Sequence, residues 1–249
     1  MRNVALFPLA LLLASAPLSA QTTITETRLK PVHVYFGGNF IVAEPQQEFG
    51  DYINTSFGGS LHVLWKPAPN GVLGLRFEGG GIGYGEEKQR VPLSETVGGR
   101  IMVDLTTSNF IGFANVGPQL MAPRGPIRPY LAPTIGFAYI GTVSSVEGVD
   151  SHQSFASDVN YDDFLFAYGA TGGIYVPLSQ GRVPVALDLS ARYHQNGKAS
   201  YLIEGSIHDN ADGTITFDPI RSRANLLTFQ IGVSIGARAS DKKHGLDDD

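Results

Sequence analysis

The sequence contains no cysteine among its 249 residues, so no disulfide framework can hold the fold together. Charged residues are also scarce, at 16% of the chain, whereas about a quarter is typical of a soluble domain. Beyond the N-terminal segment, no run approaches the roughly 20 consecutive apolar residues that a transmembrane helix needs. The net charge of −5 is mild and argues against nucleic acid as the main partner.

Glycine and aromatic residues are abundant, with 30 glycines, 14 phenylalanines and 10 tyrosines. A chain with little charge and no long apolar run is typical of a membrane β-barrel, whose apolar residues are spread over every second position. The segment 183–194 shows this pattern most clearly. From residue 185 onward its odd positions are apolar or aromatic, while its even positions include Asp188, Ser190, Arg192 and His194. Since side chains alternate between the two faces of a strand, one face is apolar and the other ionic.

The chain divides into three parts by composition. Residues 1–20 have a basic start, a short apolar stretch and small residues before Gln21, which predicts a secretory signal peptide. Residues 21–238 are long enough for one domain and carry the alternating segments. Residues 239–249 form a polar C-terminal tail that ends in three aspartates.

Alternation predicts eight strands, and the lengths of their connections show how they are arranged. The expected strands are 32–43, 56–66, 72–84, 101–120, 128–142, 164–176, 183–194 and 224–238. Short connections at 67–71, 123–127 and 178–182 alternate with long polar ones at 44–55, 85–98, 143–162 and 195–222. Outer-membrane barrels have short periplasmic turns, longer extracellular loops and an even number of strands. The sequence therefore predicts an all-β fold, an eight-stranded antiparallel up-and-down transmembrane β-barrel. A soluble barrel of the lipocalin kind is the alternative with the same strand count.

Two positions interrupt this regularity. The apolar phase of the fourth strand changes between Leu105 and Phe110, which predicts a β-bulge at residues 106–109, or else a turn and an extra strand. Residues 85–98 are charged and form either a loop or a hairpin that extends beyond the membrane. Aromatic girdle positions are expected at Trp65, Tyr84, Tyr139 and Phe164, near the strand ends. Tyr84 fits this role only if the preceding glycines hold a bulge.

An eight-stranded barrel is just wide enough for its side chains to fill it. The inward-facing set includes Arg76, Glu78, Asp188 and Arg192, and opposite charges there must pair because a lone buried charge is costly. We therefore expect a lumen charge network in which the two arginines neutralise the two carboxylates. Such a core conducts poorly, although the many lumen glycines leave room for a narrow path.

Catalytic and metal-binding chemistry find little support. Ser190 and His194 share a face, but four strand residues separate them by roughly 13 Å, too far for a nucleophile and its base. His152 and Ser154 lie in a polar loop, and the six histidines are scattered. Residues 209–213 resemble part of a calcium loop, but with Gly213 at the turn position the first and last loop positions are His208 and Pro219, where acidic residues are required. The Asp-Gly pair at 212–213 predicts a hairpin tip instead. No cofactor, metal site or catalytic residue is expected, and the chain is not expected to be an enzyme.

Three strands carry a family resemblance: residues 34–40, 130–139 and 229–236, which combine alternation with regularly placed glycines. Together with the leader they resemble the small outer-membrane β-barrel families of the OmpA, OmpX and opacity-protein type. The resemblance implies a bacterial outer-membrane location, with membrane lipids and the outer-membrane assembly machinery as partners. It also implies a structural or surface-interaction role through the long loops. A narrow porin-like channel and a lipid-A-modifying enzyme are the alternatives. Such barrels usually end on an aromatic residue, whereas this chain continues to Asp249.

Overall fold

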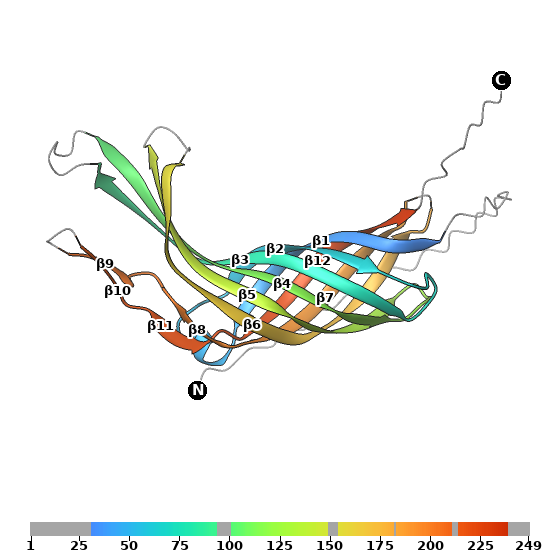
Figure 1. The fold of residues 1–249 in the computed structure, drawn as a ribbon. Coiled ribbons are helices and arrows are strands. Elements are labelled where there is room, and N and C mark those ends of the chain that lie inside the picture. The colour runs from blue at the N-terminus through green and yellow to red at the C-terminus, as the bar shows by residue number, and fades with distance from the viewer. Residues whose placement is uncertain (1–30, 94–100, 149–153, 182, 211–213, 239–249) are drawn as a thin grey trace, which may run out of the picture.

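The computed structural model describes residues 31–93, 101–148, 154–181, 183–210 and 214–238. Eight strands close into an antiparallel barrel in the order β1-β12-β7-β6-β5-β4-β3-β2 (Figure 1). They are β1 (Val32–Pro45), β2 (Ser56–Trp65), β3 (Leu73–Pro92), β4 (Met102–Met121), β5 (Arg128–Gly148), β6 (Ser154–Ser179), β7 (Val185–Asn196) and β12 (Leu226–Arg238). The predicted barrel and its strand number are confirmed.

Closure depends on β1, which pairs on both of its edges. Phe36 lies opposite Val63 of β2 and opposite Ile235 of β12. The ring therefore has no free edge through its central part. This matters in a bilayer, because hydrocarbon offers no water to satisfy an unpaired backbone group. Within the described residues, no helix is long and apolar enough to cross a membrane.

The barrel is apolar outside and charged inside. Leu61 and Ile231 lie on the exterior and are 74% and 53% exposed, whereas Asp188 and Arg192 are 0% exposed in the interior. A soluble barrel would have the opposite arrangement, since burying a charge in place of a leucine is unfavourable in water. The exterior is therefore the lipid-facing surface, and the soluble alternative is excluded.

The two ends of the barrel differ. The short-turn end holds the connections at 66–72, 122–127 and 180–184, together with the start of β1 and the end of β12. The other end, the long-loop end, holds two hairpins that project well beyond the barrel, β3–β4 and β5–β6 (Figure 1). On the first of these, Arg90 donates a 2.9 Å hydrogen bond to Asp104, which holds the pKa of that carboxyl below its usual range.

These projections correct two expectations about loops. Residues 85–92 continue β3 and pair with β4, so of the two alternatives for 85–98 the extended hairpin is right for these residues. Within the expected loop at 143–162, residues 143–148 belong to β5 and residues 154–162 to β6, and the two strands remain paired as far as Glu147 and Ser154. Polar side chains dominate both segments. Alternation of apolar residues finds strands that contact lipid or core, and it misses strands that have water on both faces.

The predicted bulge at residues 106–109 is wrong. The pairing of β4 with β5 is continuous from Val103 to Val116. The extra residue lies instead on β3, where Gly83 faces Phe110 and Gly85 faces Asn109, so Tyr84 faces no residue of β4. The change of apolar phase in β4 follows from its surroundings. Its second half contacts lipid, while its first half belongs to the projecting hairpin.

The described part of the connection from β7 to β12 contains four short strands. β8 (Lys198–Tyr201) pairs with β11 (Ile220–Arg223), and β9 (Ile207–Asp209) pairs with β10 (Ile215–Phe217). The connection from β1 to β2 holds a short 3-10 helix, η1 (Gln47–Asp51). The signal peptide predicted at 1–20, the hairpin tip predicted at 212–213 and the polar tail at 239–249 lie outside the described residues.

Candidate functional site

The four charged residues expected in the lumen are brought together by β3 and β7. Arg76 donates to Glu78 at 2.9 Å and to Asp188 at 3.2 Å, and Arg192 also donates to Glu78. All four side chains are buried. With two arginines and two carboxylates, the formal charges of this charge network sum to zero, as a low-dielectric interior requires.

Glu78 is the centre of the network. One of its carboxylate oxygens accepts from both arginines, while the other accepts from Ser60 at 3.0 Å and from Gln230 at 3.4 Å. These donors come from β2, β3, β7 and β12, so a single side chain ties together strands on different sides of the barrel. Charge-assisted hydrogen bonds of this kind are about twice as strong as neutral ones.

Aromatic and hydroxyl groups complete the coordination of the other three charges. Tyr130 donates to Asp188 at 2.8 Å, and its ring lies 5.7 Å from the guanidinium carbon of Arg76. Arg192 donates to Thr171 at 2.6 Å and lies 5.9 Å from the ring of Phe113. Each charged group therefore has a partner beyond its ionic one, and a connected network of this kind contributes more than its separate hydrogen bonds.

A second polar cluster lies beside this network. Nε2 of His62 lies 2.7 Å from the hydroxyl of Ser234 and 3.2 Å from that of Tyr175, and the latter two hydroxyls also contact each other. Gly37 leaves the space that the imidazole occupies, because a Cβ at this position would lie 2.3 Å from its Cε1 atom. His62 and Ser234 are both buried in a filled core. The pair therefore connects β2 with β12.

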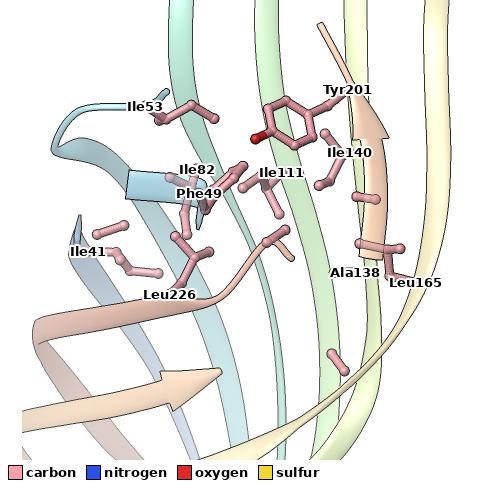
Figure 2. Packing of buried hydrophobic residues seen from close by; sticks show 14 residues of the cluster. Ile41, Phe49, Ile53, Ile82, Ile111, Ala138, Ile140, Leu165, Tyr201 and Leu226 are labelled. Carbon is pink, nitrogen blue, oxygen red and sulfur yellow. The ribbon is translucent and has the colours of Figure 1, made fainter. Parts of the chain in front are cut away.

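An apolar cluster closes the lumen toward the long-loop end, and we call it the mouth cluster (Figure 2). Its centre is Phe49 of η1, whose ring centroid lies 5.1 Å from that of Tyr201 on β8 and 6.2 Å from that of Tyr84. The barrel wall contributes Ile41, Ile82, Ile111, Ile140, Leu165 and Leu226. The β1–β2 and β7–β12 connections thus fold back over the barrel and cover the charge network on the side of the long-loop end.

Three of the four expected girdle residues lie on the exterior. Trp65 is at the short-turn end, and Phe164 and Tyr139 are on the opposite half, where Phe164 stacks on Phe137 and Tyr139 packs against Phe110. Tyr84, the fourth expected girdle residue, does not lie on the exterior, and this expectation is wrong. Because β3 pairs with β4 without a shift as far as Gly83, Tyr84 keeps the inward phase of Glu78 and Ile82. Its side chain joins the mouth cluster and donates to the carbonyl of Leu202 at 3.2 Å.

The mouth cluster itself was missed by sequence reasoning, since Phe49 and Tyr201 lie in segments that are polar overall. The available signal was the presence of Phe49, Tyr52 and Ile53 within the connection 46–55, where a solvated loop needs no large apolar residue. The described part of the chain holds no group of three or more histidine, aspartate or glutamate side chains placed to hold a metal.

A closed antiparallel barrel with an apolar exterior, a charged interior, short turns at one end and long loops at the other defines the class of outer-membrane β-barrels. The chain is an integral outer-membrane protein of this class.

No protein-family model matches the chain, and no curated protein matches its sequence. Solved structures that are similar to it include Ail, the attachment invasion locus protein of Yersinia pestis, with 12% identity over 83% of this chain and 99% of that one and a TM-score of 0.41. Neisserial surface protein A is 14% identical over 82% of this chain and 97% of its own, with a TM-score of 0.39. A major outer membrane protein of Thermus thermophilus is 11% identical over 82% of this chain and 99% of its own, with a TM-score of 0.42.

Proposed function

We propose that this protein is a plugged barrel with a structural and surface-interaction role, which it exerts through the projecting strands at its long-loop end. The observation that carries the proposal is the double closure of the lumen. The charge network spans the middle of the barrel, and the mouth cluster covers it. Outer-membrane lipids and the assembly machinery of that membrane are the expected partners, and no catalytic role is proposed.

The projecting hairpins support the second half of the proposal. Leu93 and Ile101 flank the end of the β3–β4 hairpin, and both are about half exposed. Val159 on β6 and Ile215 on β10 add exposed apolar side chains at the same end of the molecule. Large apolar side chains that project beyond the membrane region are a common mark of an interaction surface.

Conductance tests whether the lumen is plugged. In planar lipid bilayers we expect no large, stable, ohmic steps from the purified protein, because ions would have to cross a network of buried, paired charges. A conducting porin measured in the same bilayers is the positive control. Large and stable ohmic steps from this protein would contradict the plugged lumen and favour the narrow porin-like channel instead.

Adhesion tests the surface role. Cells that display the double variant Leu93→Ser/Ile101→Ser should adhere less to an apolar surface such as polystyrene than cells that display the wild type, since the exposed apolar area at the hairpin end is lost. The matched control is Ile127→Ser/Leu178→Ser, which removes two exposed apolar side chains near the short-turn end. Equal adhesion of the Leu93→Ser/Ile101→Ser variant and the wild type would argue against this surface.

A further inference from the structure

Among the described residues, the charged side chains at the short-turn end of the barrel are all basic. The described parts of the segments 31–37, 64–75, 119–130, 174–187 and 232–238 contain Lys66, Arg124, Arg128 and Arg238, and they contain no aspartate or glutamate. This is unexpected in a chain with 23 acidic and 18 basic residues overall. The positive charge is therefore concentrated where the short turns meet.

A cavity of about 480 Å³ opens at this end, and we call it the arginine vestibule. Arg124, Arg128 and Arg238 line it, and none of its lining residues is acidic. Nε of Arg128 donates to the backbone carbonyl of Gly125 at 3.3 Å. The guanidinium of Arg128 is thus oriented by a neutral acceptor, which does not cancel its positive charge.

The walls of the vestibule strengthen its positive electrostatic potential. Five prolines line it, and their fixed φ angles make the turns around it rigid. These prolines are Pro31, Pro69, Pro123, Pro177 and Pro184. A cleft with charge of one sign and walls of low polarity focuses its potential and concentrates ligands of the opposite sign.

The inner end of the vestibule is closed. Tyr175 lines it and is buried, and its hydroxyl lies 3.2 Å from Nε2 of His62 in the polar cluster described above. A ligand that enters from the short-turn side therefore stops at this tyrosine. The geometry fits a binding site better than a passage through the barrel.

We propose that the arginine vestibule binds anions that carry carboxylate or phosphate groups, with Arg124 and Arg128 as the principal contacts. Guanidinium groups bind such anions through paired N–H donors, which a single ammonium cannot provide. The chain carries one candidate source, the aspartates at 247–249, which follow Arg238 after a spacer of eight residues, 239–246. An anion from the periplasm is the other source.

Isothermal titration of the full-length barrel in neutral detergent, with inorganic pyrophosphate as the probe, tests the proposal. To keep the acidic tail from competing, the variant Asp247→Asn/Asp248→Asn/Asp249→Asn is titrated beside the wild type. We expect saturable binding of one pyrophosphate to this variant, weakening as sodium chloride rises from about 0.05 to 0.3 M. Binding to the wild type that is about tenfold weaker would identify the tail as the resident anion, whereas equal affinity would indicate a ligand from outside.

Charge-matched variants separate a built site from general attraction. On the background with the neutralised tail, Arg124→Gln/Arg128→Gln should weaken pyrophosphate binding about tenfold or more, because two charged donors are lost. Arg221→Gln/Arg223→Gln on β11 removes the same charge at the other end and should leave the affinity unchanged. The unboiled protein should keep its folded gel mobility in every variant. Absence of saturable binding to the neutralised-tail variant, or equal weakening by both double variants, would overturn the proposal.

Discussion

Replacing Glu78 with leucine should lower the free energy of unfolding by about 3–5 kcal/mol, the usual cost of removing one partner from a buried ionic cluster. The wild-type network has two positive and two negative groups. Without Glu78, Arg192 loses its only carboxylate partner in the network, and Arg76 retains only Asp188. Equilibrium unfolding in guanidinium chloride, followed by the mobility of unboiled protein on gels, measures the loss.

A second variant separates lost charge balance from lost packing. Glu78→Leu/Arg192→Leu removes one charge of each sign, and Arg76 and Asp188 remain as a neutral pair. We expect this double variant to be more stable than Glu78→Leu alone, although it has lost more hydrogen bonds. The single variant Arg192→Leu is measured as well. If the loss of stability in the double variant equals the sum of the losses in Glu78→Leu and Arg192→Leu, the network is not held together by charge balance.

Phe49→Ala should be the most disruptive substitution outside the barrel wall, with a loss of about 3–5 kcal/mol if the site cannot collapse. Phe49 is fully buried between Tyr84 and Tyr201, and η1 is otherwise held by few polar contacts. One of these joins the backbone N–H of Arg223 to the carboxylate of Glu48 at 3.2 Å. Since η1 contacts β11, its release should expose the basic residues of β11 to trypsin.

Two measurements check the Phe49 substitution. The unfolding midpoint reports the loss of stability, and the rate of tryptic cleavage at Arg221 and Arg223 reports the exposure of β11. Tyr52→Ala is the matched control, since Tyr52 lies in the same connection and is half exposed. It should change neither quantity appreciably. Cleavage at the wild-type rate in the Phe49→Ala protein would show that the mouth cluster does not hold the loops in place.

Sequence patterns predict this barrel well wherever a strand separates two different solvents. On β7, the alternation of Leu187 and Leu189 with Asp188 and Arg192 is a direct consequence of lipid on one side and a filled lumen on the other. The same logic placed Arg76 and Glu78 in the interior, where the structure brings them into contact with Asp188 and Arg192.

Patterns fail where both faces of a strand meet water or where a loop folds back. The projecting part of β5 and β6 is polar on both faces, so its alternation carries no information about pairing. Tyr84 was assigned to the wrong face, because the outward assignment needed a bulge among the preceding glycines, whereas β3 pairs with β4 without a shift from Leu73 to Gly83 and keeps its inward phase. The inward position of Phe49 depends on contacts with β8, which lies more than a hundred residues further along the chain.

The central claim is that the apolar face of each barrel strand contacts lipid and that its polar face is enclosed. Because the chain has no cysteine, single cysteines introduced one at a time at positions 57 and 59–65 of β2 can carry a nitroxide label without a background signal. Gly58 is left unchanged, because a Cβ there would lie 2.1 Å from the carbonyl oxygen of Gly81. Collision rates with oxygen and with a water-soluble nickel chelate then report the surroundings of each label. We expect high oxygen and low nickel accessibility at the odd positions, which include Leu61, and low accessibility to both at the even positions, which include Ser60 and His62. The claim would be contradicted by labels at odd positions that collide frequently with the nickel chelate. It would also be contradicted by labels at even positions whose collision rate with oxygen is as high as that of a label in lipid.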